Sequence, residues 1–193
     1  MPIDAETTEA TEIPAWVDAA EVGPEVARAA WTPAARDVLI GIAGKYHAVI
    51  TFKELAASVQ ETTGIRTKQM MHHWVGDVLG RVAADCVSRD EPLLSSLCVT
   101  ADGSVGDGYA VAVTTVRGKA PADGDDHAAL ERLACYKFFG ANIPAGGGNP
   151  ALTARLSARR TRLRKIAHEE RVIPLCSKCQ IAVPPSGICD NCD

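Results

Sequence analysis

The sequence predicts an α+β fold, mainly α, with a winged helix-turn-helix core and a small C-terminal zinc ribbon. Three observations lead to this prediction. Apolar residues recur at helical spacing before residue 88, a strand–turn–strand pattern follows, and two C-x2-C pairs end the chain. With 193 residues, the chain is long enough for one substantial domain and small appendages.

Residues 1–30 are expected to form an acidic, flexible leader. Residues 1–25 hold seven carboxylates and no lysine or arginine, and large apolar groups are sparse. Ordering such a segment buries too little apolar surface to offset the lost conformational entropy. Neither a secretory signal nor a spanning stretch is visible. We therefore expect a cytoplasmic protein without membrane contact, associated with the nucleoid if it binds DNA.

The winged-helix domain is expected over residues 31–140. Thr32 fits an N-cap, with Pro33 in the first helical position. A second helix follows Thr51 as its N-cap and ends at Gly64, where the apolar pattern stops.

A longer amphipathic helix is expected to begin at Thr67. Its apolar stripe recurs at spacings of three and four residues and comprises Met71, Val75, Val78, Val82 and Cys86. Two helices joined by a short turn with glycine are typical of a helix-turn-helix, whose second helix lies in the DNA major groove. The side chains expected to contact DNA here are Arg66, Lys68, Gln69, His72 and His73.

The adjacent pair His72 and His73 leaves three interpretations open. The two side chains lie on a solvated helix face, or contact DNA, or bind a metal ion. The metal interpretation meets the objection that successive helical residues point about 100° apart.

A β-hairpin is expected after this helix, and it would form the wing. Leu93–Val99 supply one strand, Asp102–Gly103 a tight turn, and Tyr109–Val113 a second strand with alternating faces. Cys98 is expected to be a core residue of the first strand. A further helix ends at Gly140. Its inward residues are expected to be Leu130, Leu133, Ala134 and Phe138.

Residues 141–172 are expected to form a Gly/Pro linker and then a basic helix. Residues 151–175 hold seven basic residues and two acidic ones. The cations expected to contact DNA phosphates are Arg155, Arg159, Arg160, Arg162, Arg164 and Lys165. Arginine forms bidentate phosphate contacts, which give affinity and salt dependence rather than sequence choice. A merely solvated helix face is the alternative interpretation.

Residues 173–193 predict a zinc ribbon. Two C-x2-C pairs, Cys176 with Cys179 and Cys189 with Cys192, supply the four soft ligands of a tetrahedral structural zinc site. Because all four positions would be filled by protein, the zinc is expected to be structural and not catalytic. So small a segment has little core, so the metal would supply much of its folding free energy.

Three short patterns occur in order between residues 45 and 113. They are Thr51, Leu55 and Ala56, then Val75, Gly76 and Leu79, and then Pro92, Asp102, Gly103, Gly106 and Tyr109. In order and spacing they resemble the C-terminal domain of the alkylguanine-DNA alkyltransferases and alkyltransferase-like proteins. The resemblance implies a winged-helix surface that faces DNA.

The family's acceptor cysteine, histidine and arginine correspond to Ser95, Ser96 and Leu97, and Cys98 is offset by three residues. A thiolate acceptor needs a low pKa and a base beside it. The resemblance therefore implies DNA binding without alkyl transfer. His73 stands where the family has the arginine that fills the space of a flipped base.

We therefore expect a non-enzymatic protein that binds double-stranded DNA, acting in transcription regulation or recognising altered bases without repairing them. Two alternatives stay open. One is an adaptor that uses the same modules to bind a protein partner. The other is a nucleic-acid-modifying enzyme with Ser95 or Cys98 as its nucleophile.

Overall fold

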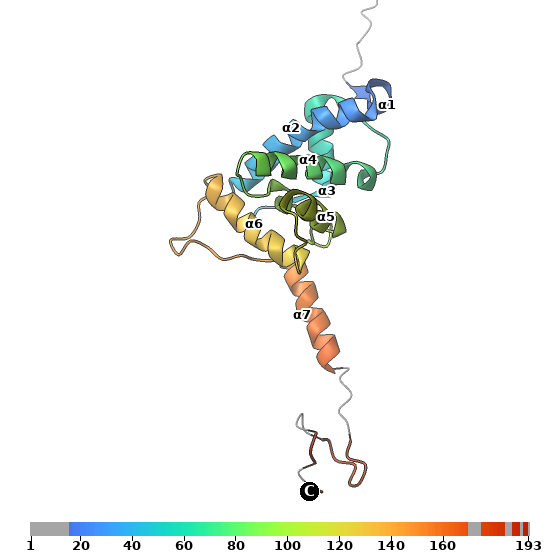
Figure 1. Ribbon diagram of the computed structural model, residues 1–193, viewed down its shortest axis with the longest axis vertical. Helices are drawn as coiled ribbons and strands as arrows, with labels where there is room; N and C mark the ends of the chain where they lie inside the picture. Colours follow the sequence, from blue (N-terminus) through green and yellow to red (C-terminus); the bar gives the residue numbers. More distant parts are fainter. Residues whose placement is uncertain (1–15, 170–174, 184–186, 190, 193) are drawn as a thin grey trace, which may run out of the picture. The chain divides into compact units, whose positions relative to one another are not determined.

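The chain divides into two compact units, the N-terminal unit (residues 1–153) and the C-terminal unit (residues 154–193). The computed structural model describes residues 16–169, 175–183, 187–189 and 191–192 (Figure 1). Over these residues the protein is mainly helical, and its strands are two residues long. The expected mainly α composition is therefore confirmed.

The N-terminal unit contains six α-helices, two 3₁₀ helices and four short strands among its described residues. In chain order they are β1 (Val17–Asp18), α1 (Ala19–Val22), α2 (Pro24–Ala43), β2 (Ile50–Thr51), α3 (Phe52–Thr63), β3 (Ile65–Arg66), η1 (Met71–His73), α4 (Val75–Ser88), η2 (Leu94–Leu97), β4 (Cys98–Val99), α5 (Asp107–Arg117) and α6 (Gly124–Phe138). β1 pairs with β3 and β2 pairs with β4, both in parallel. These two pairs of two-residue strands hold neighbouring loops together, and they are too short to form a sheet layer of the fold.

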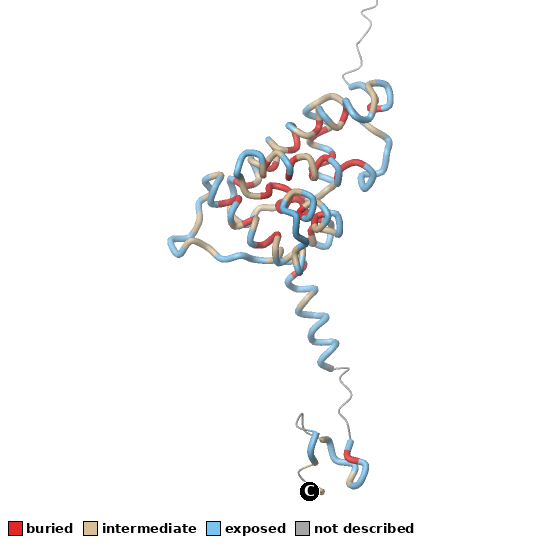
Figure 2. The backbone as a smooth tube through the Cα atoms, in the orientation of Figure 1, coloured by how far each residue is buried: buried red, intermediate tan, exposed pale blue. Residues whose placement is uncertain are grey.

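The core of this unit lies where α2 packs against α3 and α4, and where α4 packs against α5 (Figure 2). Leu39 of α2, Val59 of α3 and Val82 of α4 are at most 1% exposed. The rings of Trp31 and Trp74 meet with their centroids 4.3 Å apart. Helical stripes that face one another bury most of the apolar surface here.

The leader predicted over residues 1–30 has the wrong boundary. α2 begins at Pro24, since Gly23 turns the chain with φ 92° and proline suits the first turn of a helix. Ala27 is fully buried and Trp31 is 2% exposed. The first fifteen residues of that leader lie outside the described residues. The apolar surface that α2 buries stabilises an ordered helix from Pro24 onward, although the segment before it is acidic.

The predicted helix start at Thr32 is also wrong. Thr32 Oγ1 donates to the carbonyl oxygen of Arg28 at 2.8 Å, which is a contact within a helix and not an N-cap. Pro33 lies inside α2.

The helix predicted after Thr51 is confirmed as α3. Thr51 Oγ1 accepts from the backbone N–H of Glu54 at 3.2 Å, and the Glu54 carboxylate accepts from the Thr51 N–H at 2.8 Å. This reciprocal pair is a capping box. Gly64 ends α3 with φ 68°, a conformation that favours glycine.

The helix predicted from Thr67 begins later, at Val75. Side chains take the backbone amides before it: Gln60 Oε1 accepts from the Thr67 N–H at 2.8 Å, and Thr67 Oγ1 from the Gln69 N–H at 3.1 Å. Such side-chain bonds compete with helix formation. Trp74 then anchors the start of α4, because it is only 2% exposed.

The predicted wing is wrong, because the described residues 92–113 form no β-hairpin. Leu94–Leu97 form η2, β4 pairs in parallel with β2, and Tyr109–Val113 lie within α5. Tyr109 and Val113 are both buried, and their spacing of four residues suits a helix as well as a strand. The tight turn itself is present, since the Thr100 N–H donates to the Ser104 carbonyl oxygen at 2.7 Å. Cys98 is a core residue as predicted, 1% exposed.

The last predicted helix is present as α6, but with a different face inward. Leu130 and Phe138 are 59% and 56% exposed. The residues of α6 that are buried instead are Ala128, Ala129, Arg132, Cys135 and Tyr136. Arg132 donates to the carbonyl oxygens of Ser96 and Ala151, both at 3.1 Å, so a cation occupies a position that hydropathy assigns to solvent.

Residues 141–153, predicted as the first part of a linker, belong to the N-terminal unit. The Asn149 N–H donates to Tyr46 Oη at 3.2 Å, and Thr153 Oγ1 donates to the Gly103 carbonyl oxygen at 2.8 Å. A side chain at Gly148 would meet Tyr46 Oη at 2.6 Å, so this close approach requires glycine. The C-terminal unit then begins with α7 (Ala154–Glu169) and ends with the cysteine ribbon.

Candidate metal centre and candidate nucleic-acid interface

The four cysteines of the ribbon form one cluster. Cys176 Sγ lies 3.8 Å from Cys192 Sγ, and Cys179 Sγ lies 3.5 Å from Cys189 Sγ. All four sulfur atoms lie within 4.8 Å of one another. In a tetrahedron with metal–sulfur bonds of about 2.3 Å, the sulfur atoms are roughly 3.8 Å apart. The predicted ligand set can therefore hold one metal ion.

Tight turns place each pair of cysteines. In the first pair, the Cys176 N–H donates to the Ile181 carbonyl oxygen at 2.8 Å, and the Gln180 N–H donates back to the Cys176 carbonyl oxygen at 2.9 Å. In the second pair, the Cys192 N–H donates to the Cys189 carbonyl oxygen at 3.2 Å. These turns point the two sulfur atoms of each pair to the same side.

The backbone around the first pair favours thiolates. The N–H of Ile181 holds the pKa of the Cys179 thiol at about 6, below its ordinary value. The N–H groups of Cys179 and Lys178 lower the pKa of Cys176. Its hydrogen bond with Cys179 raises the pKa of Cys192 to about 11. Part of the negative charge that a cation needs is therefore present, and metal binding would displace the remaining protons.

The cations predicted to contact phosphates all lie on α7. Five of them are exposed and Arg160 is half-buried, and α7 is drawn as exposed along most of its length (Figure 2). At about 100° per residue, Arg155, Arg159 and Arg162 share one face, and Arg160 and Arg164 share another. Residues 154–168 contain no carboxylate.

Like charges therefore face one another along α7. Arg155 and Arg159 are four residues apart, and so are Arg160 and Arg164. Each such pair destabilises a helix by roughly 0.2–0.5 kcal/mol. A polyanion with charges along the helix would be attracted to this run of cations.

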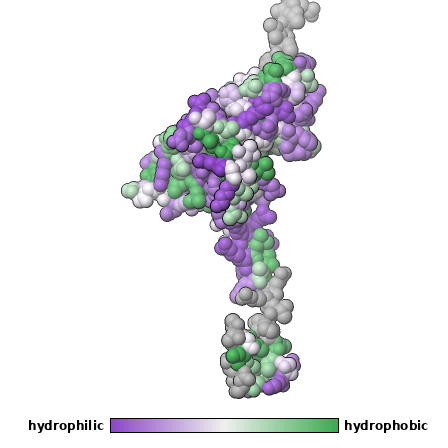
Figure 3. Space-filling view, in the orientation of Figure 1, coloured by the Kyte–Doolittle hydropathy of each residue, from purple (hydrophilic) through white to green (hydrophobic). Residues whose placement is uncertain are grey.

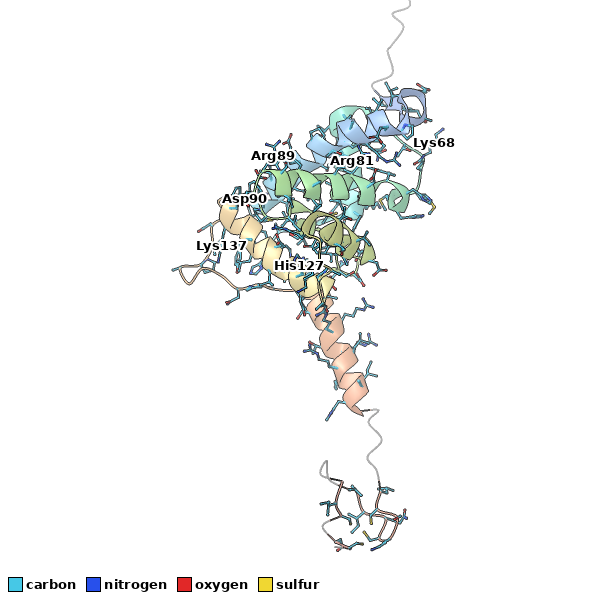
Figure 4. The ribbon with its side chains drawn as sticks, viewed as in Figure 1. Lys68, Arg81, Arg89, Asp90, His127 and Lys137 are labelled. Carbon is cyan, nitrogen blue, oxygen red and sulfur yellow. The ribbon has the colours of Figure 1, made fainter. Side chains whose placement is uncertain are left out.

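The other predicted DNA-contacting residues lie on one exposed segment, residues 66–73, between α3 and α4. Arg66 is in β3, Lys68 and Gln69 are in an irregular link, and His72 and His73 are in η1. None of these five lies on a long helix, which corrects the predicted recognition helix. Figure 4 labels Lys68 on this segment.

This segment carries a pair of contacts that the sequence pattern does not predict. The guanidinium carbon of Arg66 lies 5.7 Å from the centroid of the Trp16 ring, a cation–π geometry. The imidazole centroids of His72 and His73 are 4.0 Å apart, so the two rings lie together rather than diverging.

The helix expected to enter a DNA groove, α4, is tied to α2 by ion pairs. Arg81 of α4 pairs with Glu25 at 2.7 Å, Asp77 pairs with Arg28 at 2.9 Å, and Asp85 pairs with Arg36 at 3.3 Å. Between its ends α4 carries two carboxylates and one arginine. Sequence reasoning overlooked these carboxylates, whose spacing of eight residues puts them on the exposed face. This face is not the cationic surface that phosphates require.

The two candidate nucleophiles are buried in the N-terminal unit. Cys98 is 1% exposed, and burial raises the pKa of its thiol far above the ordinary value. Ser95 is 4% exposed and its hydroxyl has no hydrogen-bond partner. Because activation of a hydroxyl needs an adjacent base, this geometry offers no support for an enzyme that uses Ser95 or Cys98.

Among the described residues, no helix combines the length and apolar character needed to cross a lipid bilayer. The chain matches no family model, no curated protein and no solved structure, so the resemblance to the alkyltransferase domain stays a prediction.

Proposed function

We propose that this protein binds double-stranded DNA without enzymatic action, chiefly through helix α7, and that a structural zinc ion holds the ribbon that follows. The observation that carries this proposal is the run of six exposed or half-exposed cations on α7 with no carboxylate between residues 154 and 168.

Zinc fits the metal centre best. Four cysteine sulfurs at tetrahedral separations are the ligand set of structural zinc sites, and the ion needs no further ligand. Hard cations such as Mg²⁺ and Ca²⁺ prefer oxygen ligands. Zinc would stabilise the ribbon and leave no open position for a substrate.

Phosphate contacts by α7 would give affinity with little sequence choice. Residues 66–73 add a second set of exposed donors: Arg66, Lys68, Gln69, His72 and His73. Because this segment is a short link and not a helix, it would reach DNA as a loop. A protein that binds DNA in this way could act in transcription regulation or in the recognition of altered bases.

A DNA titration at several salt concentrations tests the proposal. Each phosphate contact contributes about −0.9 to the slope of log affinity against log salt concentration, so contacts by Arg155, Arg159 and Arg162 on one face of α7 give roughly −3. Arg159→Gln with Arg162→Gln removes two cations from one face of α7. We expect this double variant to reduce the magnitude of the slope by about 2.

Two matched controls remove the same charge elsewhere. Arg160→Gln with Arg164→Gln changes the opposite face of α7, and Lys53→Gln with Lys119→Gln changes exposed lysines of the N-terminal unit. Both control pairs should reduce the magnitude of the slope less than Arg159→Gln with Arg162→Gln does. If all three pairs changed the slope equally, binding would depend only on the net charge of the protein. An affinity that does not change with salt concentration would refute DNA binding through α7.

A protein-interaction adaptor is the second candidate, and one observation favours it. The ribbon exposes three aliphatic side chains within a few residues of its cysteines, namely Leu175 at 59%, Ile181 at 51% and Ile188 at 56%. Figure 3 shows hydrophobic surface on the described part of this ribbon. A small module that displays aliphatic groups is suited to a protein surface. Changing Leu175 and Ile181 to Ser should leave the DNA affinity unchanged if α7 carries the function.

A further inference from the structure

Among the described residues of the N-terminal unit, the exposed sulfur-containing side chains occur beside the pair His72 and His73. The three cysteines of this unit, Cys86, Cys98 and Cys135, are all buried. Met70 and Met71, in contrast, are 66% and 39% exposed. Soft ligand atoms accessible to solvent in the described part of this unit are therefore concentrated in two consecutive residues.

A tight turn joins these methionines to the two histidines. The His73 N–H donates to the Met70 carbonyl oxygen at 2.9 Å, and the Trp74 N–H donates to the Met71 carbonyl oxygen at 3.2 Å. Trp74 is buried against Trp31, with ring centroids 4.3 Å apart. Burial of Trp74 thus fixes one end of the turn, and the four exposed residues Met70, Met71, His72 and His73 follow one another directly in the chain.

The histidine geometry removes the objection raised from sequence. Divergence by about 100° per residue applies to a regular α-helix, whereas His72 and His73 lie in η1 with ring centroids 4.0 Å apart. Rotation of the two side chains from this stacked position would turn one nitrogen of each ring toward the same ion. Both rings are exposed, so a metal can reach them.

We propose that Met70, Met71, His72 and His73 form a second metal site, which takes a single Cu(I) ion. Thioether sulfur selects Cu(I), and imidazole also suits copper. All four ligands are neutral, and Arg66 and Lys68 lie in the same segment. A nearby positive charge opposes a divalent cation about twice as strongly as a monovalent one.

The ribbon thiolates are the strongest competitors for Cu(I), so the experiment removes them. The probe is Cu(I) alone, delivered anaerobically in acetonitrile to the full chain with all four ribbon cysteines changed to Ser. Chemical shifts of ¹³C-labelled methionine methyl groups and of histidine ring protons report where the ion binds. The chain holds three methionines, so the Met1 methyl serves as an internal reference.

We expect the methyl signals of Met70 and Met71 and the ring signals of His72 and His73 to shift together and to saturate at one equivalent. The added pair His72→Gln and His73→Gln should abolish the methyl shifts. His168→Gln, which removes an exposed histidine of α7, should leave them unchanged.

Three results would overturn the assignment. They are methionine methyl signals that do not respond to Cu(I), methyl shifts that persist when both histidines are replaced, and an equal response to Zn(II). The zinc-loaded wild-type chain provides a second measurement in case the four substitutions disturb folding. There, Cu(I) should shift the Met70 and Met71 methyl signals, and zinc release without such shifts would also refute the site.

Discussion

The two units of this protein are stabilised in different ways. The N-terminal unit buries facing apolar stripes, and Leu39, Val82, Leu93 and Leu97 are all fully buried. The described residues of the C-terminal unit form a largely exposed charged helix and a ribbon that exposes Leu175, Ile181 and Ile188. The comparison sets a unit determined by apolar packing beside a ribbon that buries little apolar surface, which is the part of the chain that a bound metal would stabilise.

Removal of the metal is expected to have the largest effect, and it should unfold the ribbon without affecting the N-terminal unit. Zinc binding contributes apparent free energies of about 10–16 kcal/mol to small zinc-binding peptides. We expect a chelator to abolish the amide chemical-shift dispersion of the ribbon. All three tryptophans lie in the N-terminal unit, so tryptophan fluorescence should report an unchanged thermal transition there.

A reciprocal pair of variants sharpens this test. Cys179→Ser should lose the metal and leave the tryptophan transition in place. Cys98→Ser should retain the metal and destabilise the N-terminal unit, because it buries a hydroxyl in an apolar site. If either variant disturbs both units, then the two do not fold independently.

Trp74→Ala is expected to have the next largest effect. Loss of this buried indole should destabilise the N-terminal unit by about 3–5 kcal/mol, measured by denaturant unfolding. Trp16→Ala is the control, since Trp16 is 41% exposed and its loss should cost little. Trp74→Phe should cost less than Trp74→Ala, because the indole Nε1 has no hydrogen-bond partner. If Trp74→Ala and Trp16→Ala lowered the free energy of unfolding equally, then Trp74 would not be the buried residue that anchors residues 66–73.

Thr51→Ala is expected to have the smallest effect, about 1 kcal/mol from the lost N-cap of α3. This loss should depend on pH. The hydrogen bond from the Thr51 hydroxyl lowers the pKa of Glu54 in the folded chain. The ionised carboxylate therefore stabilises the fold above its ordinary pKa, and this contribution is lost as pH falls through the lowered value. Unfolding at neutral and at acidic pH checks the direction, and a penalty that grows on acidification would contradict the capping box.

Local signals in the sequence were reliable where the interacting groups are close together in the chain. The capping box needs only Thr51 and Glu54, and each C-x2-C turn needs only four residues. The N-cap at Thr51 and the two cysteine pairs were predicted correctly, because their geometry depends on contacts within a turn, whereas the reciprocal hydrogen bond to Glu54 was not predicted. The cluster of Cys176, Cys179, Cys189 and Cys192 follows from two such turns and the chain between them.

The prediction of a wing was wrong because the apolar pattern of residues 109–113 fits either a strand or a helix. Apolar residues at Tyr109, Val111 and Val113 alternate as a strand does, yet Tyr109 and Val113 also lie on one helical face. The structure buries those two and leaves Val111 66% exposed. Packing of α5 against α4 decides between the two, and that contact cannot be read from a local window.

The sequence by itself determined the mainly helical composition, the capping of α3, the two cysteine pairs that form one cluster, and the location of the cations on α7. Only the tertiary structure decided where α2 and α4 begin, which face of α6 is buried, and that His72 and His73 lie together. The physical reason is range. Caps, turns and charge runs depend on neighbours within a few residues, whereas burial of Trp31, Trp74 and Arg132 depends on segments distant in the chain.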